Sequence, residues 1–127
     1  MKIAINIFYF IFTFFFAGVE PSEEIVAALK QGKSSELVKY FNEKVSIKII
    51  NQEDVLSKSQ AEANLNFFFE KHPVKAFSSS HVSSVNNGAQ YITGTLETSN
   101  GKFRVSILLR QNLIAQFRIE NDNDWFY

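Results

Sequence analysis

The sequence predicts a single α+β domain whose elements follow the order α-α-β-α-β-β-β-β. The chain has 127 residues, 46% of them hydrophobic, which suits one domain with one core. Apolar residues recur at helical spacing up to residue 71, and after Pro73 their period changes to two. Two Asn-Gly pairs then separate alternating segments, which is a strong hairpin signal. Helices at the start and a strand meander at the end indicate helices packed on one face of a mostly antiparallel sheet.

The N-terminal segment has the pattern of a secretory signal peptide. Lys2 precedes an apolar run over residues 3–16, and Ala17-Gly18 follows it. A helix of this length spans about 21 Å, whereas a bilayer core is about 30 Å thick. We therefore expect a signal peptide over residues 1–18 and an exported protein, periplasmic or extracellular. The alternative is an uncleaved membrane anchor, because Phe15 or Phe16 occupies a position before the cut where a small residue is usual.

The domain itself is expected over residues 19–121 and begins with two helices. Ser22 can cap the first helix, which Gly32 ends. The second helix is short and begins at Ser34 or Ser35. A strand over residues 45–49 follows, since apolar and polar residues alternate there.

A turn over residues 51–54 leads to the third helix. Ser57 and Gln60 form a capping box at its start, and Pro73 ends it after about Lys71. Phe67 is expected to face outward. The apolar face of this helix consists of Ala61, Leu65, Phe68 and Phe69.

The four remaining strands are expected at residues 75–85, 89–99, 102–110 and 114–121. A two-residue turn at Asn100-Gly101 pairs Glu97 with Arg104. A three-residue loop over 111–113 aligns the apolar faces of the last hairpin and pairs Arg104 with Glu120. The predicted apolar face consists of Ile92, Leu96, Phe103, Val105, Ile107, Leu109, Ala115, Phe117 and Ile119.

The opposite face of the sheet carries Glu97, Arg104 and Glu120 in a row. The simplest interpretation is a set of solvated cross-strand ion pairs, each worth less than about 1 kcal/mol. The alternative is a flat polar-aromatic surface, including Tyr91 and Leu108, through which two copies form a homodimer.

A pocket is the most specific site that the sequence predicts. If Asn87-Gly88 is a two-residue turn, His81 lies opposite Gly94 and points toward the helices. The ligand-pocket candidates are then Phe77, Ser79, His81, Ile92, Gly94 and Phe117. If Asn86 joins the turn, the register shifts by one and Val82 points inward instead. A hydrogen-bonded core histidine is a simpler interpretation of His81 than a catalytic base, which needs an orienting partner.

Composition excludes several classes of function. The chain has no cysteine, which excludes disulfides, thiol nucleophiles and zinc–thiolate sites. The two histidines, His72 and His81, form no metal motif, and His72 is explained by its place at a helix end. The net charge is zero and no basic block is present. We therefore expect no metal, no cofactor and no nucleic-acid partner.

A family resemblance runs through most of the domain. It is carried by Tyr40-Phe41, by LSKSQAE at 56–62, by His81 with NGAQYITGTL at 87–96, and by TSNGKFRV at 98–105 with FRIE at 117–120. These stretches resemble domain of unknown function 4783, a family of small exported Bacteroidetes proteins with a nuclear transport factor 2-like, or cystatin-like, fold. The chain departs from the family pattern at Leu56, where an aromatic is common, and in its shortened last hairpin.

The resemblance implies a curved sheet wrapped around helices to form a cone, often with a pocket at its open end and often dimeric through the sheet. It implies no catalytic residue. We therefore expect a non-enzymatic exported domain that binds a small apolar ligand or a protein partner through the cone cavity or the sheet face. The alternatives are an envelope-associated dimeric assembly protein, or an isomerase- or hydrolase-like enzyme that uses His81. Residues 122–127 form an aromatic tail that either packs back or docks onto a partner.

Overall fold

The computed structural model describes residues 20–84 and 88–122. The predicted signal peptide, the tip of the Asn87-Gly88 turn and the aromatic tail beyond Asp122 lie outside these residues. The helical elements are α2 (Pro21–Gln31), α3 (Ser34–Leu37), the 3-10 turn η1 (Val38–Tyr40) and α4 (Lys58–Lys71). The strands are β1 (Phe41–Ile49), β2 (Gln52–Ser57), β3 (Val74–Ser84), β4 (Ala89–Thr98), β5 (Gly101–Arg110) and β6 (Leu113–Asn121). The predicted order of elements is confirmed, with one additional strand, β2.

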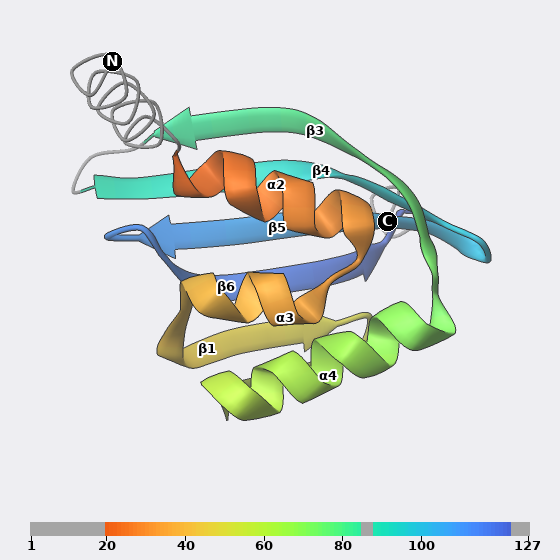
Figure 1. The fold of residues 1–127 in the computed structure, drawn as a ribbon, viewed down its shortest axis with the longest axis horizontal. Coiled ribbons are helices and arrows are strands. Elements are labelled where there is room, and N and C mark those ends of the chain that lie inside the picture. The colour runs from red at the N-terminus through yellow and green to blue at the C-terminus, as the bar shows by residue number, and fades with distance from the viewer. Residues whose placement is uncertain (1–19, 85–87, 123–127) are drawn as a thin grey trace, which may run out of the picture.

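The six strands form one curved sheet, and α2, α3 and α4 cover one of its faces (Figure 1). The strand order is β2-β1-β6-β5-β4-β3. All neighbours are antiparallel except β1 and β6, which are parallel. The α+β class and the mostly antiparallel sheet are therefore confirmed.

Strand β2 was not predicted, because residues 51–54 were expected to be a turn that leads to the helix. The turn is in fact confined to Ile50 and Asn51, and residues 52–57 fold back along β1. Nearly every side chain of β2 is exposed because the strand forms an edge of the sheet. A polar edge strand has no apolar alternation, so the sequence carries no strand signal there.

The core lies between the helices and the covered face of the sheet. Helix α2 buries Ile25 and Leu29, and α4 buries the four residues predicted for its apolar face. The sheet contributes the predicted apolar residues of β4, β5 and β6, with one exception. Phe67 points outward as expected, with 61% of its surface exposed.

The exception is Ala115 in the last hairpin. The predicted pairs Arg104–Glu120 and Ile107–Phe117 are both present. The turn is shorter than expected, since it contains only Gln111 and Asn112, which have φ angles of 52° and 68° as a type I′ turn requires. A bulge at Ala115 reconciles this two-residue turn with the apolar register, and Ile114 is buried instead.

The hairpin between β4 and β5 turns at Ser99 and Asn100, one residue earlier than predicted, so the partner of each residue shifts by two positions. Thr98 pairs with Gly101, so Glu97 lies opposite Lys102 and Arg104 lies opposite Thr95. The expected pairing of Glu97 with Arg104 is therefore wrong. The shift is an even number, so each side chain keeps its predicted face.

Strand β3 contains a bulge that the sequence did not predict. Ser79 pairs with Gly94, but His81 pairs with Thr93 and Val82 with Ile92. The residue between them, Ser80, bonds through its hydroxyl to the Thr93 carbonyl oxygen at 3.2 Å. Beyond the bulge the register is the alternative one, in which Val82 rather than His81 shares the helix-covered face with Ile92.

No helix within residues 20–84 and 88–122 has the length and apolar character needed to cross a bilayer.

Candidate binding pocket

The residues predicted to line a pocket do not lie around one cavity. Ile92 and Phe117 are fully buried in the core, and Ser79 and His81 are exposed. The Phe77 ring occupies the space that a side chain at position 94 would fill, so Gly94 leaves no cavity there. A Cβ built on Gly94 would lie 2.6 Å from a carbon of that ring. The register expected for His81 is wrong, and the side chain lies on the outer face of the sheet with Thr93.

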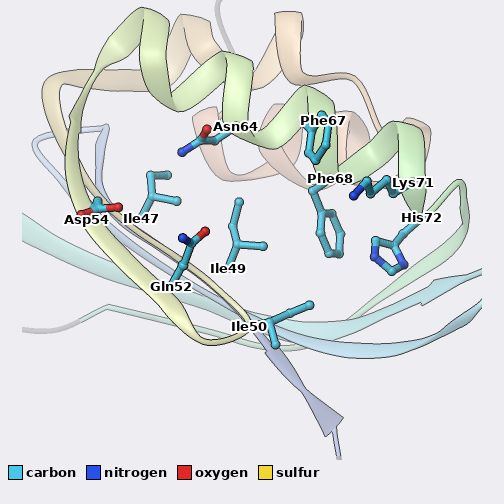
Figure 2. Close-up of a pocket in the computed structure, with 10 residues that line it drawn as sticks. All are labelled: Ile47, Ile49, Ile50, Gln52, Asp54, Asn64, Phe67, Phe68, Lys71 and His72. Atoms are coloured by element: carbon cyan, nitrogen blue, oxygen red, sulfur yellow. The ribbon is translucent and has the colours of Figure 1, made fainter.

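A pocket of about 310 Å³ lies instead between α4 and the β1–β2 hairpin (Figure 2). The second half of α4 and its end contribute five of its residues: Asn64, Phe67, Phe68, Lys71 and His72. The hairpin contributes the other five: Ile47, Ile49, Ile50, Gln52 and Asp54. The pocket exists because β2 folds back along β1 and extends the sheet beneath the helix.

The floor of the pocket is apolar. Ile47 and Ile49 alternate along β1 and therefore point to the same face as α4. Phe68 is 4% exposed and belongs to the core, whereas the neighbouring Phe67 lies at the solvent side. Successive helix positions are about 100° apart, so one of the two rings anchors the helix and the other remains available to a ligand.

Ile50 lines the pocket on the side away from α4 and has an unfavourable backbone conformation. Its φ angle is 59°, a region that β-branched residues rarely adopt. The left-handed conformation costs a residue with a Cβ roughly 1–2 kcal/mol. The Ile50 amide donates a hydrogen bond to the Ile119 carbonyl at 2.7 Å, which holds the turn in place. Glycine or asparagine would suit this backbone better, but an isoleucine stands here and its side chain lines the pocket.

The His72 ring is fixed from several directions. It stacks on Phe68 with ring centroids 4.6 Å apart and meets the edge of Phe103 at 5.0 Å. Its Nδ1 lies 2.7 Å from Asn100 Oδ1, and Asn100 Nδ2 donates to the Lys71 carbonyl at 3.1 Å. The second bond makes Oδ1 the acceptor, so we assign the hydrogen to Nδ1. Within the described residues Nε2 has no hydrogen-bond partner.

Charged groups stand at opposite ends of the pocket. Figure 2 shows Asp54 at one end and Lys71 beside His72 at the other, with Ile47, Ile49 and Phe68 between them. The Lys71 ammonium lies 4.4 Å from the centroid of the Phe67 ring, which is a cation–π contact. Neither Asp54 nor Lys71 forms an ion pair with another residue of the described ranges.

The outer face of the sheet carries a separate ion-pair network. Lys48 bonds to Glu120 at 2.9 Å, and Arg118 bonds to Glu53 at 3.0 Å and approaches Glu120 at 3.5 Å. The hydrogen bond and charge of Lys48, and then Arg118, lower the pKa of Glu120, although burial opposes them. Glu120 thus pairs across β6 and β1, and Glu97 of the predicted row lies apart, opposite Lys102. Among the described residues no three histidine or carboxylate side chains are grouped as a metal site.

The sequence of residues 22–121 matches the family described as Domain of unknown function (DUF4783). The chain belongs to the DUF4783 family. A DUF4783 protein from Bacteroides uniformis, whose crystal structure is known, is 36% identical over 78% of this chain and 94% of its own, with a TM-score of 0.74. A DUF4783 protein from Bacteroides fragilis is 37% identical over 77% and 95%, with a TM-score of 0.72.

More distant structures share the fold of this DUF4783 domain. An NTF2-like protein of unknown function from Cytophaga hutchinsonii is 13% identical over 84% of this chain and 92% of its own, with a TM-score of 0.59. A cystatin-fold protein from Novosphingobium aromaticivorans is also 13% identical, over 80% and 98%, with a TM-score of 0.59. The predicted family and the NTF2-like, cystatin-like fold are therefore confirmed. No curated protein matches the chain.

The pocket of this DUF4783 domain was missed because half of its lining comes from the β1–β2 hairpin, whose second strand was not predicted. One signal was present in the sequence: Phe67 is a large aromatic residue on the outward side of an amphipathic helix, with Lys71 one turn later. The sequence did not indicate what faces Phe67, because residues 51–54 were predicted to be a turn and no strand was predicted before Ser57.

Proposed function

We propose that this DUF4783 domain is a non-enzymatic binding module that holds a small, mostly apolar ligand between α4 and the β1–β2 hairpin. The observation that carries the proposal is the pocket of about 310 Å³ with an apolar floor. Ligand sites in proteins are concave, largely apolar and bounded by a few polar groups, with volumes of roughly 300–1,000 Å³. Burying ligand surface on Ile49, Phe67 and Phe68 supplies affinity at about 25 cal/mol per Å² of apolar area.

The pocket is preorganised, which favours binding. Phe68 packs edge-on against Phe69 and Phe103, so the floor does not need to rearrange when a ligand enters. His72 is held by Asn100, and the Ile50 turn is tied to β6. A site whose walls are already ordered loses little conformational entropy on binding.

We also propose that the protein is exported, either to the periplasm or out of the cell. The support is the short apolar run over residues 3–16 behind Lys2. In this proposal the protein contacts the membrane only if the N-terminal segment is not cleaved.

Two alternatives are less well supported. A homodimer through the outer face of the sheet would have to desolvate the ion pairs of Lys48 with Glu120 and of Arg118 with Glu53, which is costly. An enzyme that uses His81 would need its base and its substrate on one side of the sheet. His81 lies on the outer face, whereas the pocket lies on the helix-covered face.

The proposal can be tested by titrating the protein with indole while recording amide chemical shifts. We expect shifts clustered at the pocket, around Ile49, Phe67 and His72. Asn64→Trp is expected to fill the pocket and to weaken indole binding by about tenfold or more. The matched control is Ala63→Trp, because Ala63 is exposed on the same helix and does not line the pocket.

The proposal fails if indole shifts gather on the outer face of the sheet, or if the two tryptophan variants bind indole equally well. It also fails if the wild-type protein shows no saturable shifts. Thermal unfolding of both variants identifies any loss of binding that is due to loss of the fold.

A further inference from the structure

We infer that the ligand of this pocket is a short apolar peptide with free ends, whose amino group binds at Asp54 and whose carboxylate binds at Lys71. The inference rests on the proposed function, because it names the class of molecule that the same pocket holds. It starts from the separation of charge in the pocket, with a carboxylate at one end, an ammonium at the other and an apolar floor between them (Figure 2).

The cationic end of the pocket is ordered before any ligand arrives. Lys71 is held over the Phe67 ring at 4.4 Å, and its carbonyl accepts a bond from Asn100. His72 presents Nε2 at the same end, because its Nδ1 bonds to Asn100. The Lys71 ammonium, held beside the Phe67 ring, is a suitable partner for the carboxylate of an amphiphile.

The anionic end is a single carboxylate that faces into the pocket from an edge strand. Asp54 pairs with Ile47 across the hairpin and therefore points to the helix-covered face, whereas its neighbour Glu53 points outward and binds Arg118. Gln52 and Asn64 supply neutral polar groups to the rest of the lining. An unpaired inward carboxylate at an edge strand is suited to a cationic group that a ligand supplies.

The size of the pocket selects among molecules that carry both charges. A sphere of 310 Å³ is about 8 Å across. In a free amino acid both charges are attached to one carbon, so it cannot reach both ends. Two extended residues span roughly 7 Å, which matches this length, whereas three span roughly 11 Å and exceed it. Apolar side chains would then lie on Ile49 and Phe68.

The experiment uses the dipeptide leucyl-phenylalanine, its N-acetyl form and its C-terminal amide, each titrated into the full chain by calorimetry, with indole in parallel. We expect acetylation to weaken binding by about fivefold in the wild-type protein and to have almost no effect in Asp54→Asn. Amidation should likewise weaken binding by about fivefold in the wild-type protein and have almost no effect in Lys71→Gln. Glu97→Gln and Lys75→Gln are the charge-matched controls, since both residues are exposed and neither lines the pocket.

Each outcome decides the inference. The inference is supported if acetylation weakens binding only when Asp54 is present and amidation weakens it only when Lys71 is present. A merely structural role of Asp54 or Lys71 would lower the affinity for all three peptide forms alike. If the three peptide forms bind equally, or if only indole binds, the charge assignment is wrong while the apolar pocket stands. If neither peptide nor indole binds, the inference and the proposed function both fail.

Discussion

At the scale of single residues, Gly94 is the position that permits the close packing of β3 on β4. A Cβ at this position would lie 2.4 Å from the Ser78 carbonyl oxygen and 2.6 Å from the Phe77 ring. The first of these neighbours is backbone, so it cannot move aside cheaply. Gly94 therefore belongs to the packing of the core and not to the lining of a cavity.

Gly94→Ala is expected to lower the free energy of unfolding by about 3 kcal/mol, since one methyl group must displace both strand and ring. Denaturant unfolding followed by far-UV circular dichroism measures the loss. Gly88→Ala is the control, because no atom lies within 4 Å of its Cβ and only its φ of 74° carries a cost, about 1 kcal/mol. Equal losses in the two variants would contradict this assignment.

Ile50 gives a second residue-scale prediction. Ile50→Asn relieves the left-handed strain while losing part of the apolar contact, so we expect the free energy of unfolding to change by less than about 1 kcal/mol. Ile49→Asn has no strain to relieve and should cost about 2–3 kcal/mol. Both residues are half-buried and adjacent, which makes the comparison direct. If both variants lose the same free energy of unfolding, the backbone strain at Ile50 does not contribute measurably to stability.

At the scale of elements, helix α4 positions half of the pocket and depends on its first turn. The Ser57 hydroxyl accepts a hydrogen bond from the Gln60 amide at 3.3 Å, and the Gln60 side chain accepts from the Ser57 amide at 3.1 Å. This is the capping box that the sequence predicts. The other end of the helix is held by Asn100, as described above.

Ser57→Ala should lower the free energy of unfolding by about 1 kcal/mol through the loss of the cap. Ser59→Ala, two positions later, should stay within about 0.5 kcal/mol of wild type because it leaves both capping bonds intact. Chemical denaturation of the two variants gives the comparison. A loss of similar size at Ser59 would show that the capping bonds do not control the stability of α4.

The elements that the sequence predicted correctly are those with local causes. Helix α4 is bounded by a capping box and a proline, and the alternation along β5 identifies Val105, Ile107 and Leu109 as buried. The elements that it missed depend on competition between partners. Asn100 lies in the β4–β5 turn as expected, but its turn partner is Ser99 rather than Gly101, so the pairing of the strands shifts by two residues. The Asn100 side chain bonds to the Lys71 carbonyl at the end of α4. The bulge in β3 likewise lies next to Gly94 of the neighbouring strand, since the register shifts directly after the pair of Ser79 with Gly94.

At the scale of the whole molecule, the parallel pairing of β1 with β6 joins residues about seventy positions apart. No local pattern indicates such a contact, and the pocket depends on it because it fixes the β1–β2 hairpin against the sheet. The candidate site was therefore less predictable than the fold. The sequence correctly identified Phe67 as an outward residue and Phe68 as a core residue, but not the strand that completes the pocket around them.

The ion pairs that join β1 to β6 give a pH-dependent prediction. The pKa of Glu120 is lowered in the folded protein, chiefly by Lys48, so its contribution is present above the unfolded pKa. That contribution is lost as the pH falls through the folded pKa. Glu120→Gln should therefore cost about 1 kcal/mol at pH 7 and almost nothing once the pH has fallen below the lowered pKa of the wild-type carboxyl.

The partner variant for this prediction is Lys48→Met. In its presence, Glu120→Gln should cost less at pH 7, because the main cause of the lowered pKa is gone. Urea unfolding at a series of pH values measures both effects. A cost of Glu120→Gln that is independent of pH, or unchanged by Lys48→Met, would contradict the role given to this pair.

The central claim is that the domain works by holding a small molecule between α4 and the β1–β2 hairpin. Native mass spectrometry of the exported protein tests this most directly. One spectrum reports the mass of the processed chain, its oligomeric state and any retained ligand. We expect a single copy that carries a small-molecule adduct, with the adduct absent from Asn64→Trp and kept in Ala63→Trp. A dimer without an adduct, or an adduct that Asn64→Trp retains, would contradict the claim.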